Sequence, residues 1–210
     1  MSKYRVQKYG KSELTILQRE PLFQGFFEME AVTFTHQRFD GQWSEPVRRE
    51  VFERGDAAVI LPYDPISDQV ILVEQLRVPA ARTSETPWLL ELPAGIIEAG
   101  EAPESVARRE LEEETGLAAK SLTFLYSYLP SPGACSERLY LYLAEVTAPA
   151  ADAGQGVFGL DDEHEDILRH VVSREQAMAW IEDGTIDNAS TILGLQWLAL
   201  KRHALFRSEG

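Results

Sequence analysis

The sequence predicts an α/β (α+β) layered domain that follows a small antiparallel β subdomain. Three short extended runs precede any helical pattern, and the rest of the chain mixes strand-like and helix-like segments, as layered α/β folds do. With 210 residues, 44% of them hydrophobic, the chain can bury one large core beside a smaller companion. We place the boundary near Gly55, with the β subdomain over residues 1–54 and the main domain over residues 55–210.

The expected N-terminal strands mix polar and apolar residues, as half-exposed antiparallel strands do. They cover residues 14–18, 31–39 and 47–54. Asp40 and Gly41 form a turn signal between the second and third runs, which predicts a hairpin. Such a polar sheet would have little core of its own.

The strands expected beyond the boundary are more apolar, and the first two are continuous enough to be buried on both faces. A long stretch rich in Ala, Gly and Asp predicts a flexible loop before the last strand. The strands are expected at residues 57–62, 69–75, 123–129, 138–145 and 167–172, and the loop at residues 148–159.

Three helices are predicted from their capping signals. Pro103 suits a first helical turn and Gly116 suits a C-terminal cap. Ser173 and Gln176 have the spacing of a capping box, and Asp187 can cap the last helix. The helices are expected over residues 103–115, from Ser173 to about residue 182, and over residues 189–205.

Charge and cysteine content limit the classes of partner. The formal net charge is −14, which opposes binding to nucleic acid and to acidic membrane surfaces. Cys135 is the one cysteine, so no internal disulfide can form and a reducing, cytoplasmic location is expected. We expect neither a signal peptide at residues 1–10 nor a membrane-spanning segment.

The predicted helix at residues 103–115 carries an unusual cluster of carboxylates. On an ideal helix Glu110, Glu113 and Glu114 fall within about 100° of arc. Like-charge pairs at this spacing destabilise a helix by roughly 0.2–0.5 kcal/mol each unless a cation lies among them. Arg109, one turn before Glu113, could hold that side chain. A solvated acidic face is the simple alternative, but clustered hard oxygen ligands are also what Mg²⁺ requires.

The segment from Gly95 to Leu117 resembles the complete Nudix box. The matching positions are Gly95, Glu101, Arg109, Glu110, Leu111, Glu113, Glu114, Gly116 and Leu117. The resemblance implies a Nudix-type α/β/α sandwich with a mixed sheet. Ala102 and Pro103 stand in the turn where members of the family often have a capping Ser or Thr, so the helix start would shift by a residue or lose roughly 1 kcal/mol of capping.

Flanking segments are similar to the Nudix subgroup that hydrolyses ADP-ribose to AMP and ribose 5-phosphate. One is residues 88–95, which precede the box. Another is the tripeptide Ser131, Pro132 and Gly133, whose proline lies 16 residues past Gly116. Residues 25–27 and 47–50 extend the similarity to the N-terminal segment.

The resemblance implies metal ligands on the box helix and beside it. Glu110 and Glu114 would be the main Mg²⁺ ligands, with the carbonyl of Ala94 as another and Glu113 as ligand or close support. Glu165 would be an additional ligand. Two or three Mg²⁺ ions are expected, and Mn²⁺ is expected to substitute for them.

The resemblance also implies that the acidic run at residues 161–166 is a mobile catalytic loop. It assigns Glu163 as the acceptor of the proton of the attacking water, with Glu165 as the alternative base. The assignment is chemically consistent, because general base catalysis needs a carboxylate that reaches this water. A merely solubilising loop is the competing interpretation. His164 is expected to face solvent.

Substrate contacts also follow from the resemblance. Arginine suits a pyrophosphate because its planar fork donates two hydrogen bonds, and an aromatic ring with an arginine can hold a purine. The alternatives are that Phe26 and Phe27 pack in a hydrophobic core and that Arg49 is an ordinary charge on an edge strand. The phosphates and ribose are assigned to Arg54, Arg77, Ile96 and Glu137, and the adenine end to Phe26, Phe27, Arg49 and Glu50.

The resemblance further implies a domain-swapped homodimer. The site of the other subunit would then be served by Phe26, Phe27, Arg49, Glu50 and residues 131–133.

Two alternatives for function stay open: hydrolysis of another nucleoside diphosphate sugar, such as ADP-glucose or GDP-mannose, and a non-catalytic ADP-ribose-binding module. A nucleoside triphosphate hydrolase fits the long N-terminal segment and Pro132 less well.

Overall fold

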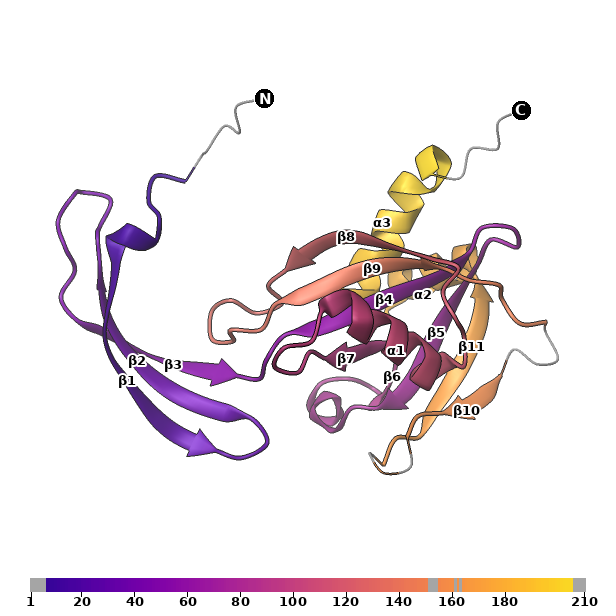
Figure 1. The fold of residues 1–210 in the computed structure, drawn as a ribbon, viewed down its shortest axis with the longest axis horizontal. Coiled ribbons are helices and arrows are strands. Elements are labelled where there is room, and N and C mark those ends of the chain that lie inside the picture. Colours follow the sequence, from indigo (N-terminus) through magenta and orange to yellow (C-terminus); the bar gives the residue numbers. More distant parts are fainter. Residues whose placement is uncertain (1–6, 151–154, 161, 163, 206–210) are drawn as a thin grey trace. The chain divides into compact units, whose positions relative to one another are not determined.

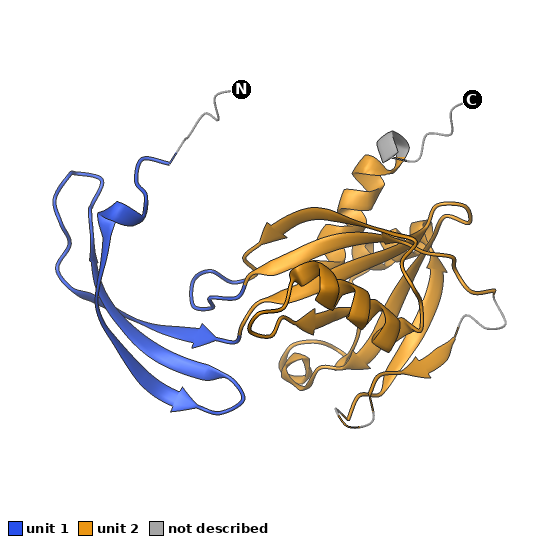
Figure 2. Ribbon diagram, viewed as in Figure 1, with its two compact units in different colours: residues 1–54, 131–137 blue, residues 55–130, 138–210 orange. Residues whose placement is uncertain are grey.

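The structure, a computed structural model, describes residues 7–150, 155–160, 162 and 164–205 (Figure 1). The chain divides into two compact units (Figure 2). Unit 1 comprises Met1–Arg54 with Ser131–Glu137, and unit 2 comprises Gly55–Pro130 with Arg138–Gly210. Within the described ranges, the helices are all too short or too polar to cross a membrane.

Unit 1 is a three-stranded antiparallel sheet in the order β1-β2-β3, which confirms the predicted N-terminal β architecture. The Asp40–Gly41 turn joins β2 to β3 as a hairpin, with Gly41 at φ +90°, where glycine is unstrained. The first strand is longer than predicted, since pairing with β2 continues beyond Pro21. The strands are β1 Leu14–Gln24, β2 Glu28–His36 and β3 Val47–Glu53, preceded by a short 3₁₀ turn, Lys11–Glu13.

A distant segment completes unit 1. The N–H of Phe52 donates to the carbonyl of Ala134 at 2.7 Å, and Phe52 forms a parallel bridge with Cys135. Cys135 is half-buried in this contact. Backbone pairing therefore places Ser131–Glu137 in unit 1, although these residues follow the box helix in the chain.

Unit 2 is built on an eight-stranded mixed sheet. Six strands follow the order β10-β11-β5-β4-β9-β8, while β6 pairs with β5 and β7 with β4. The pairing of β4 with β9 is parallel and the others are antiparallel. The strands are β4 Ala57–Asp64, β5 Gln69–Leu76, β6 Trp88–Glu91, β7 Ala94–Ile96, β8 Ser121–Tyr128, β9 Leu139–Glu145, β10 Gly156–Phe158 and β11 Ile167–Ser173, with a 3₁₀ turn at Val78–Arg82.

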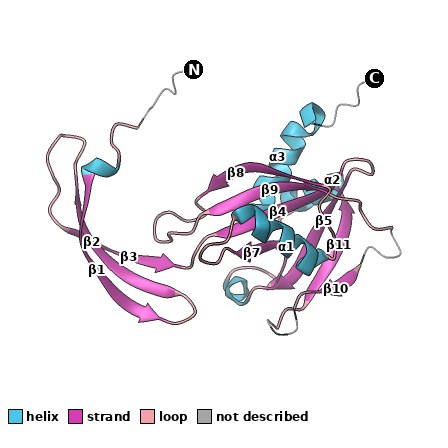
Figure 3. Ribbon diagram, in the orientation of Figure 1, coloured by secondary structure: helices cyan, strands magenta, loops and turns pink. Residues whose placement is uncertain are grey.

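Helices cover both faces of this sheet (Figure 3), which confirms the predicted α/β/α sandwich. Strand β4 is buried on both sides because alternate side chains face alternate layers. Val59 and Leu61 pack with α2 (Arg174–Glu182) and α3 (Ala189–Leu205). Ala58 and Ile60 pack against α1 (Pro103–Thr115) on the opposite face.

The helix ends follow the sequence signals with one exception. Helix α1 spans the predicted residues, with Gly116 at φ +68° after its last turn and no side-chain cap from Ala102. The Ser173 hydroxyl accepts the N–H of Gln176 at 3.1 Å, as predicted for α2. The expectation that Asp187 caps α3 is wrong. Oδ1 of Asn188 accepts the N–H of Thr191 at 3.2 Å, because Asn188 immediately precedes the first helical residue.

The predicted loop at residues 148–159 contains a short strand. Gly156–Phe158 forms β10, which pairs antiparallel with Ile167–Arg169 of β11. Three residues carry too little periodicity to indicate a strand by themselves. The pairing decides their conformation.

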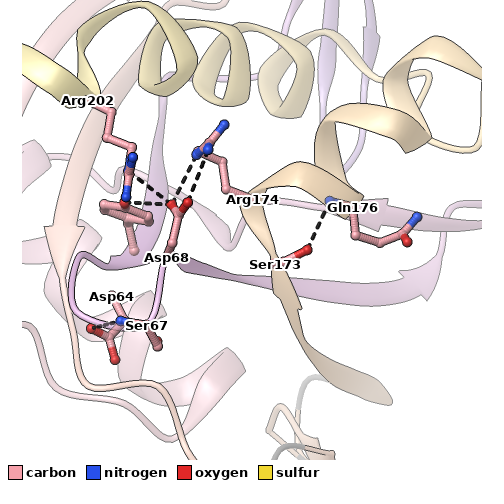
Figure 4. Close-up of polar contacts among 8 residues, drawn as sticks. Asp64, Ser67, Asp68, Ser173, Arg174, Gln176 and Arg202 are labelled. Atoms are coloured by element: carbon pink, nitrogen blue, oxygen red, sulfur yellow. Dashed lines mark hydrogen bonds and ion pairs between the residues drawn. The ribbon is translucent and has the colours of Figure 1, made fainter.

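An ion-pair cluster closes the turn between β4 and β5 (Figure 4). The carboxylate of Asp68 accepts two hydrogen bonds from Arg174, at 3.0 and 3.1 Å, and one from the Tyr63 hydroxyl at 2.8 Å. Arg202 lies 3.1 Å from the same carboxylate. Burial alone would raise the pKa of Asp68, but these donors and charges lower it below the usual value. The cluster attaches the turn to α2 and α3.

Candidate active site

Helix α1 turns two of its carboxylates toward the sheet. Glu110 is 8% exposed and Glu114 is 2% exposed, whereas Glu112 is exposed. Glu113 is half-buried at the edge of this face. Buried glutamates are rare unless they are paired or bind a metal, so the inward face of α1 is a candidate site.

The backbone of β7 lies directly against these two carboxylates. The N–H of Ala94 donates to Oε2 of Glu114 at 3.1 Å. A Cβ atom at Gly95 would overlap the carboxylate of Glu110. Any other residue at position 95 would force the Glu110 side chain to shift, which gives a physical reason for glycine as the first residue of the box.

Arg109 pairs with three carboxylates at this site. Its guanidinium lies 2.8 Å from Oε1 of Glu110 and 3.0 Å from Oε2 of Glu113, and 3.9 Å from Oε2 of Glu101. Burial opposes the charged form of Arg109, but the three carboxylates outweigh it and raise the pKa of Arg109. Of these three contacts, the sequence predicted only the one with Glu113.

Glu114 is buried near other carboxylates. Burial is the largest cause that raises the pKa of Glu114 well above the ordinary value, and the charges of Glu110 and Glu165 add to it. The hydrogen bond from Ala94 opposes the shift. A cation near these groups would favour their ionised forms.

The donor set fits a hard divalent cation in its chemistry. Carboxylate and backbone carbonyl oxygens are the ligands that Mg²⁺ prefers, and glutamates from one helix face the carbonyl-bearing strand β7. In the part of the chain that the structure describes, no three acidic or histidine side chains already stand together as a metal centre. Arg109 and the Ala94 N–H instead engage the oxygens that a cation would take.

The acidic segment is partly described. Glu163, the predicted base, lies outside the described residues. Glu165 is half-buried, and its Oε2 accepts the N–H of Leu160 at 3.2 Å. His164 is exposed, as expected.

Unit 1 brings together three of the predicted substrate residues. Nε of Arg54 lies 3.3 Å from Oε1 of Glu137, and the guanidinium lies 5.5 Å from the centre of the Phe27 ring. Phe26 is 86% exposed and meets Phe27 edge to face at 4.8 Å. The alternative prediction, that Phe26 packs in a hydrophobic core, is therefore wrong. The other predicted residues of this unit are exposed: Arg49 and Glu50 on β3, and Ser131, Pro132 and Gly133.

The two predicted substrate residues of unit 2 lie on neighbouring elements. Nε of Arg77, just after β5, donates to Oε2 of Glu91 at 2.8 Å. The charge of Arg77 lowers the pKa of Glu114, so Arg77 lies within electrostatic reach of α1. Ile96 is half-buried on β7 and pairs with Ala57.

Arg169 is a buried residue that sequence reasoning missed. It is 7% exposed, lies on β11, and donates to the carbonyl of Thr115 at the end of α1. The sequence did carry a signal for its burial, because Ile167, Arg169 and Val171 occupy every second position of the strand and so lie on one face. An arginine between two apolar positions of such a face indicates a buried, paired charge.

Comparisons with known proteins show which family the chain belongs to. The family model for the NUDIX domain matches residues 53–193. The chain is 53% identical to the ADP-ribose pyrophosphatase of Escherichia coli (strain K12) over 94% of this chain and 93% of that protein. It is 45% identical to the ADP-ribose pyrophosphatase of Haemophilus influenzae over 97% and 94% of the two chains.

More distant similarity extends to another named activity. The GDP-mannose pyrophosphatase of Enterobacter sp. (strain 638) is 34% identical over 90% of this chain and 96% of that protein. A crystal structure of an ADP compounds hydrolase matches with a TM-score of 0.66 and 25% identity, over 90% and 96% of the two chains. The chain belongs to the Nudix family.

Proposed function

We propose that this protein is a Mg²⁺-dependent hydrolase that cleaves the pyrophosphate of ADP-ribose to AMP and ribose 5-phosphate. The observation that carries the proposal is the close approach of the Ala94–Gly95 backbone to the buried carboxylates of Glu110 and Glu114. A backbone carbonyl of β7 beside the carboxylates of α1 provides oxygen ligands that suit a divalent ion and the diphosphate bound to it. The relatives named ADP-ribose pyrophosphatase support this choice of substrate.

The metal would be held by oxygens from three elements. Glu110, Glu114 and the carbonyl of Ala94 are the proposed ligands, with Glu113 and Glu165 as further ones. We infer two or three Mg²⁺ ions, for which Mn²⁺ can substitute. When bound, they would neutralise the phosphates and lower the pKa of a coordinated water. The protein meanwhile orients the ligands, since Ala94 holds Glu114 by its N–H.

Proton transfer is assigned to the acidic segment. Glu163 is the proposed proton acceptor for the attacking water, and Glu165 is the alternative. Carboxylates suit this role when they reach the water within hydrogen-bonding distance.

The substrate would be bound at both ends. Arg54, Arg77, Ile96 and Glu137 are proposed for the phosphates and terminal ribose. An exposed guanidinium such as that of Arg77, already oriented by Glu91, is suited to phosphate oxygens. The adenine end is proposed to contact Phe26, Phe27, Arg49 and Glu50.

We also propose a homodimer in which unit 1 contacts a second copy of the chain. Its sheet exposes large apolar side chains and carries a shallow groove of about 310 Å³ lined by residues of unit 1. Phe26, Phe27, Arg49, Glu50 and residues 131–133 would then serve the site of the partner. Sedimentation equilibrium tests this: the mass of a dimer is expected, and a monomer at micromolar concentration would contradict it. The exposed apolar residues of unit 1 include Leu14, Ile16, Leu17, Leu22 and Phe23.

A second candidate function is hydrolysis of GDP-mannose or another nucleoside diphosphate sugar, which the Enterobacter relative favours. Competition kinetics with ADP-ribose, ADP-glucose and GDP-mannose separate these substrates by their kcat/KM ratios. The proposal requires ADP-ribose to be preferred. Tight binding of ADP-ribose with Mg²⁺ and no release of AMP would instead indicate a binding module.

Net charge and cysteine content bear on the partners and the location of the protein. The net charge of −14 supports a small-molecule substrate rather than a nucleic-acid or membrane partner. A single cysteine supports a cytoplasmic location.

A further inference from the structure

A buried cation lies under the C-terminal end of the box helix. Nη1 of Arg169, on β11, donates to the carbonyl of Thr115 at 2.5 Å. The last turn of α1 contains no basic residue of its own, although basic groups stabilise the negative end of a helix. Arg169 supplies this charge from a neighbouring strand.

The guanidinium of Arg169 also lies 4.5 Å from the centre of the Phe158 ring. A cation over an aromatic ring is attracted more strongly when both are removed from water. Phe158 belongs to β10, and Arg169 pairs with Gly156 of the same strand. The stack therefore joins two adjacent strands to α1.

Glycines make room for this ring on two sides. A Cβ atom at Gly116 would lie 2.6 Å from the Phe158 ring, and one at Gly156 would lie 2.7 Å from it. Gly116 is also the left-handed cap of α1. The ring of Phe158 is thus seated directly on the end of the box helix.

The segment that follows Phe158 continues the attachment. The N–H of Gly159 donates to the carbonyl of Glu113 at 3.2 Å. Leu160 and Glu165 are then joined twice, by Leu160 N–H to Oε2 of Glu165 and by Glu165 N–H to the carbonyl of Leu160, each at 3.2 Å. Contacts therefore run continuously from Arg169 to the carboxylate of Glu165.

We propose that Arg169 and Phe158 are positioning residues, which fix Glu165 relative to Glu113 and Glu114 at the end of α1. The inference rests on the proposed function, because only that function gives these carboxylates a catalytic role. A displacement of about 1 Å in such a group can lower a rate by roughly 100-fold. The stack would act through Glu165 and would not itself touch the substrate.

Two substitutions separate positioning from simple stability. Arg169→Lys keeps the charge but loses the planar group that stacks on Phe158, and Phe158→Leu keeps the bulk but loses the ring. The matched control is Arg174→Lys, which weakens the clamp on Asp68 at the opposite side of the sheet from α1. Melting temperature, kcat, KM for ADP-ribose, and Mn²⁺ binding to the free protein by electron paramagnetic resonance are measured for each.

We expect Arg169→Lys and Phe158→Leu each to lower kcat by about 10- to 100-fold, with KM changed by less than about 3-fold. Mn²⁺ binding to the free protein should weaken in both. Because the two residues act as one unit, the double variant should lose little more activity than either single variant. Arg174→Lys should lower the melting temperature and leave kcat and Mn²⁺ binding unchanged.

Lower melting temperatures with wild-type kcat and Mn²⁺ binding in both variants would overturn the proposal. If Arg169→Lys does not fold, Phe158→Leu decides alone. A wild-type protein that releases no AMP from ADP-ribose would contradict the proposed function instead. The Mn²⁺ titration would then still test whether the stack positions the carboxylates.

Discussion

The N–H of Ala94 donates a hydrogen bond to Oε2 of Glu114 at 3.1 Å, so β7 and α1 meet at a carboxylate that is 2% exposed. This contact holds β7, which carries the proposed carbonyl ligand, against α1, which carries the proposed acidic ligands. In the proposed function, the same peptide segment uses its N–H to orient Glu114 and its carbonyl to bind metal.

Replacing Glu114 by glutamine should remove activity without loss of fold. In Glu114→Gln the side-chain oxygen can still accept the Ala94 N–H, but the charge that a cation needs is gone. We expect kcat to fall by at least about 100-fold, with a melting temperature equal to or above that of the wild type, since a buried charge is removed. Glu112→Gln, on the exposed side of α1, is the matched control. Wild-type turnover in Glu114→Gln would contradict the metal assignment.

Gly95→Ala tests the close approach of backbone and carboxylate. The added methyl group would overlap the side chain of Glu110, and such overpacking costs about 1–3 kcal/mol. The free energy of unfolding in urea should fall by this amount, and kcat should fall with it because Glu110 must move. Gly133→Ala, where a Cβ atom meets no atom within 4 Å, should leave the unfolding free energy unchanged. Equal stability of both variants would argue against the observed packing.

Asn188→Ala tests the cap of α3. Oδ1 of Asn188 accepts the Thr191 N–H, and its Nδ2 donates to the carbonyl of Leu90. Loss of both should destabilise the protein by about 1–3 kcal/mol in urea denaturation. Asp187→Ala removes an acceptor of the exposed Ser84 hydroxyl and should cost less than about 0.5 kcal/mol. The reverse order would restore Asp187 as the cap.

The clamp on Asp68 should make stability depend on acid pH. Hydrogen bonds and charges from Arg174, Tyr63 and Arg202 hold the folded-state pKa of Asp68 below its usual value. The carboxylate therefore stabilises the fold above the unfolded-state pKa, near 4, and this contribution is lost as pH falls through the folded-state pKa. Asp68→Asn should cost about 1–2 kcal/mol at pH 7.

The test is urea denaturation of Asp68→Asn and the wild type between pH 7 and pH 3. The difference in unfolding free energy should be constant down to about pH 4 and then shrink. A difference that stays the same at pH 3 would show that the charge of Asp68 contributes nothing.

Local signals predicted much of unit 2. The bounds of α1 follow from Pro103 and Gly116, which favour a helix start and end by their own backbone preferences. The cap at Ser173 was predicted for the same reason. The strand Gly156–Phe158 was not, because its conformation depends on pairing with β11. Asp187 and Asn188 differ by one position, and a cap is fixed by where the first helical turn begins.

Long-range contacts account for what the sequence did not predict. Ser131–Glu137 joins unit 1 through backbone pairing with Phe52, which no local pattern encodes. Among the site residues, the helical arc predicted the clustering of Glu110, Glu113 and Glu114. The contact of Arg109 with Glu110 and the stack of Arg169 on Phe158 depend on side-chain directions and on a second strand.

Product analysis is the most direct test of ADP-ribose hydrolysis by this protein. The wild-type protein is incubated with ADP-ribose and Mg²⁺, with and without a chelator, and the products are separated by chromatography. We expect AMP and ribose 5-phosphate in equal amounts, and we expect the chelator and Glu114→Gln each to abolish their formation. Intact ADP-ribose in the presence of folded protein and Mg²⁺ would contradict it.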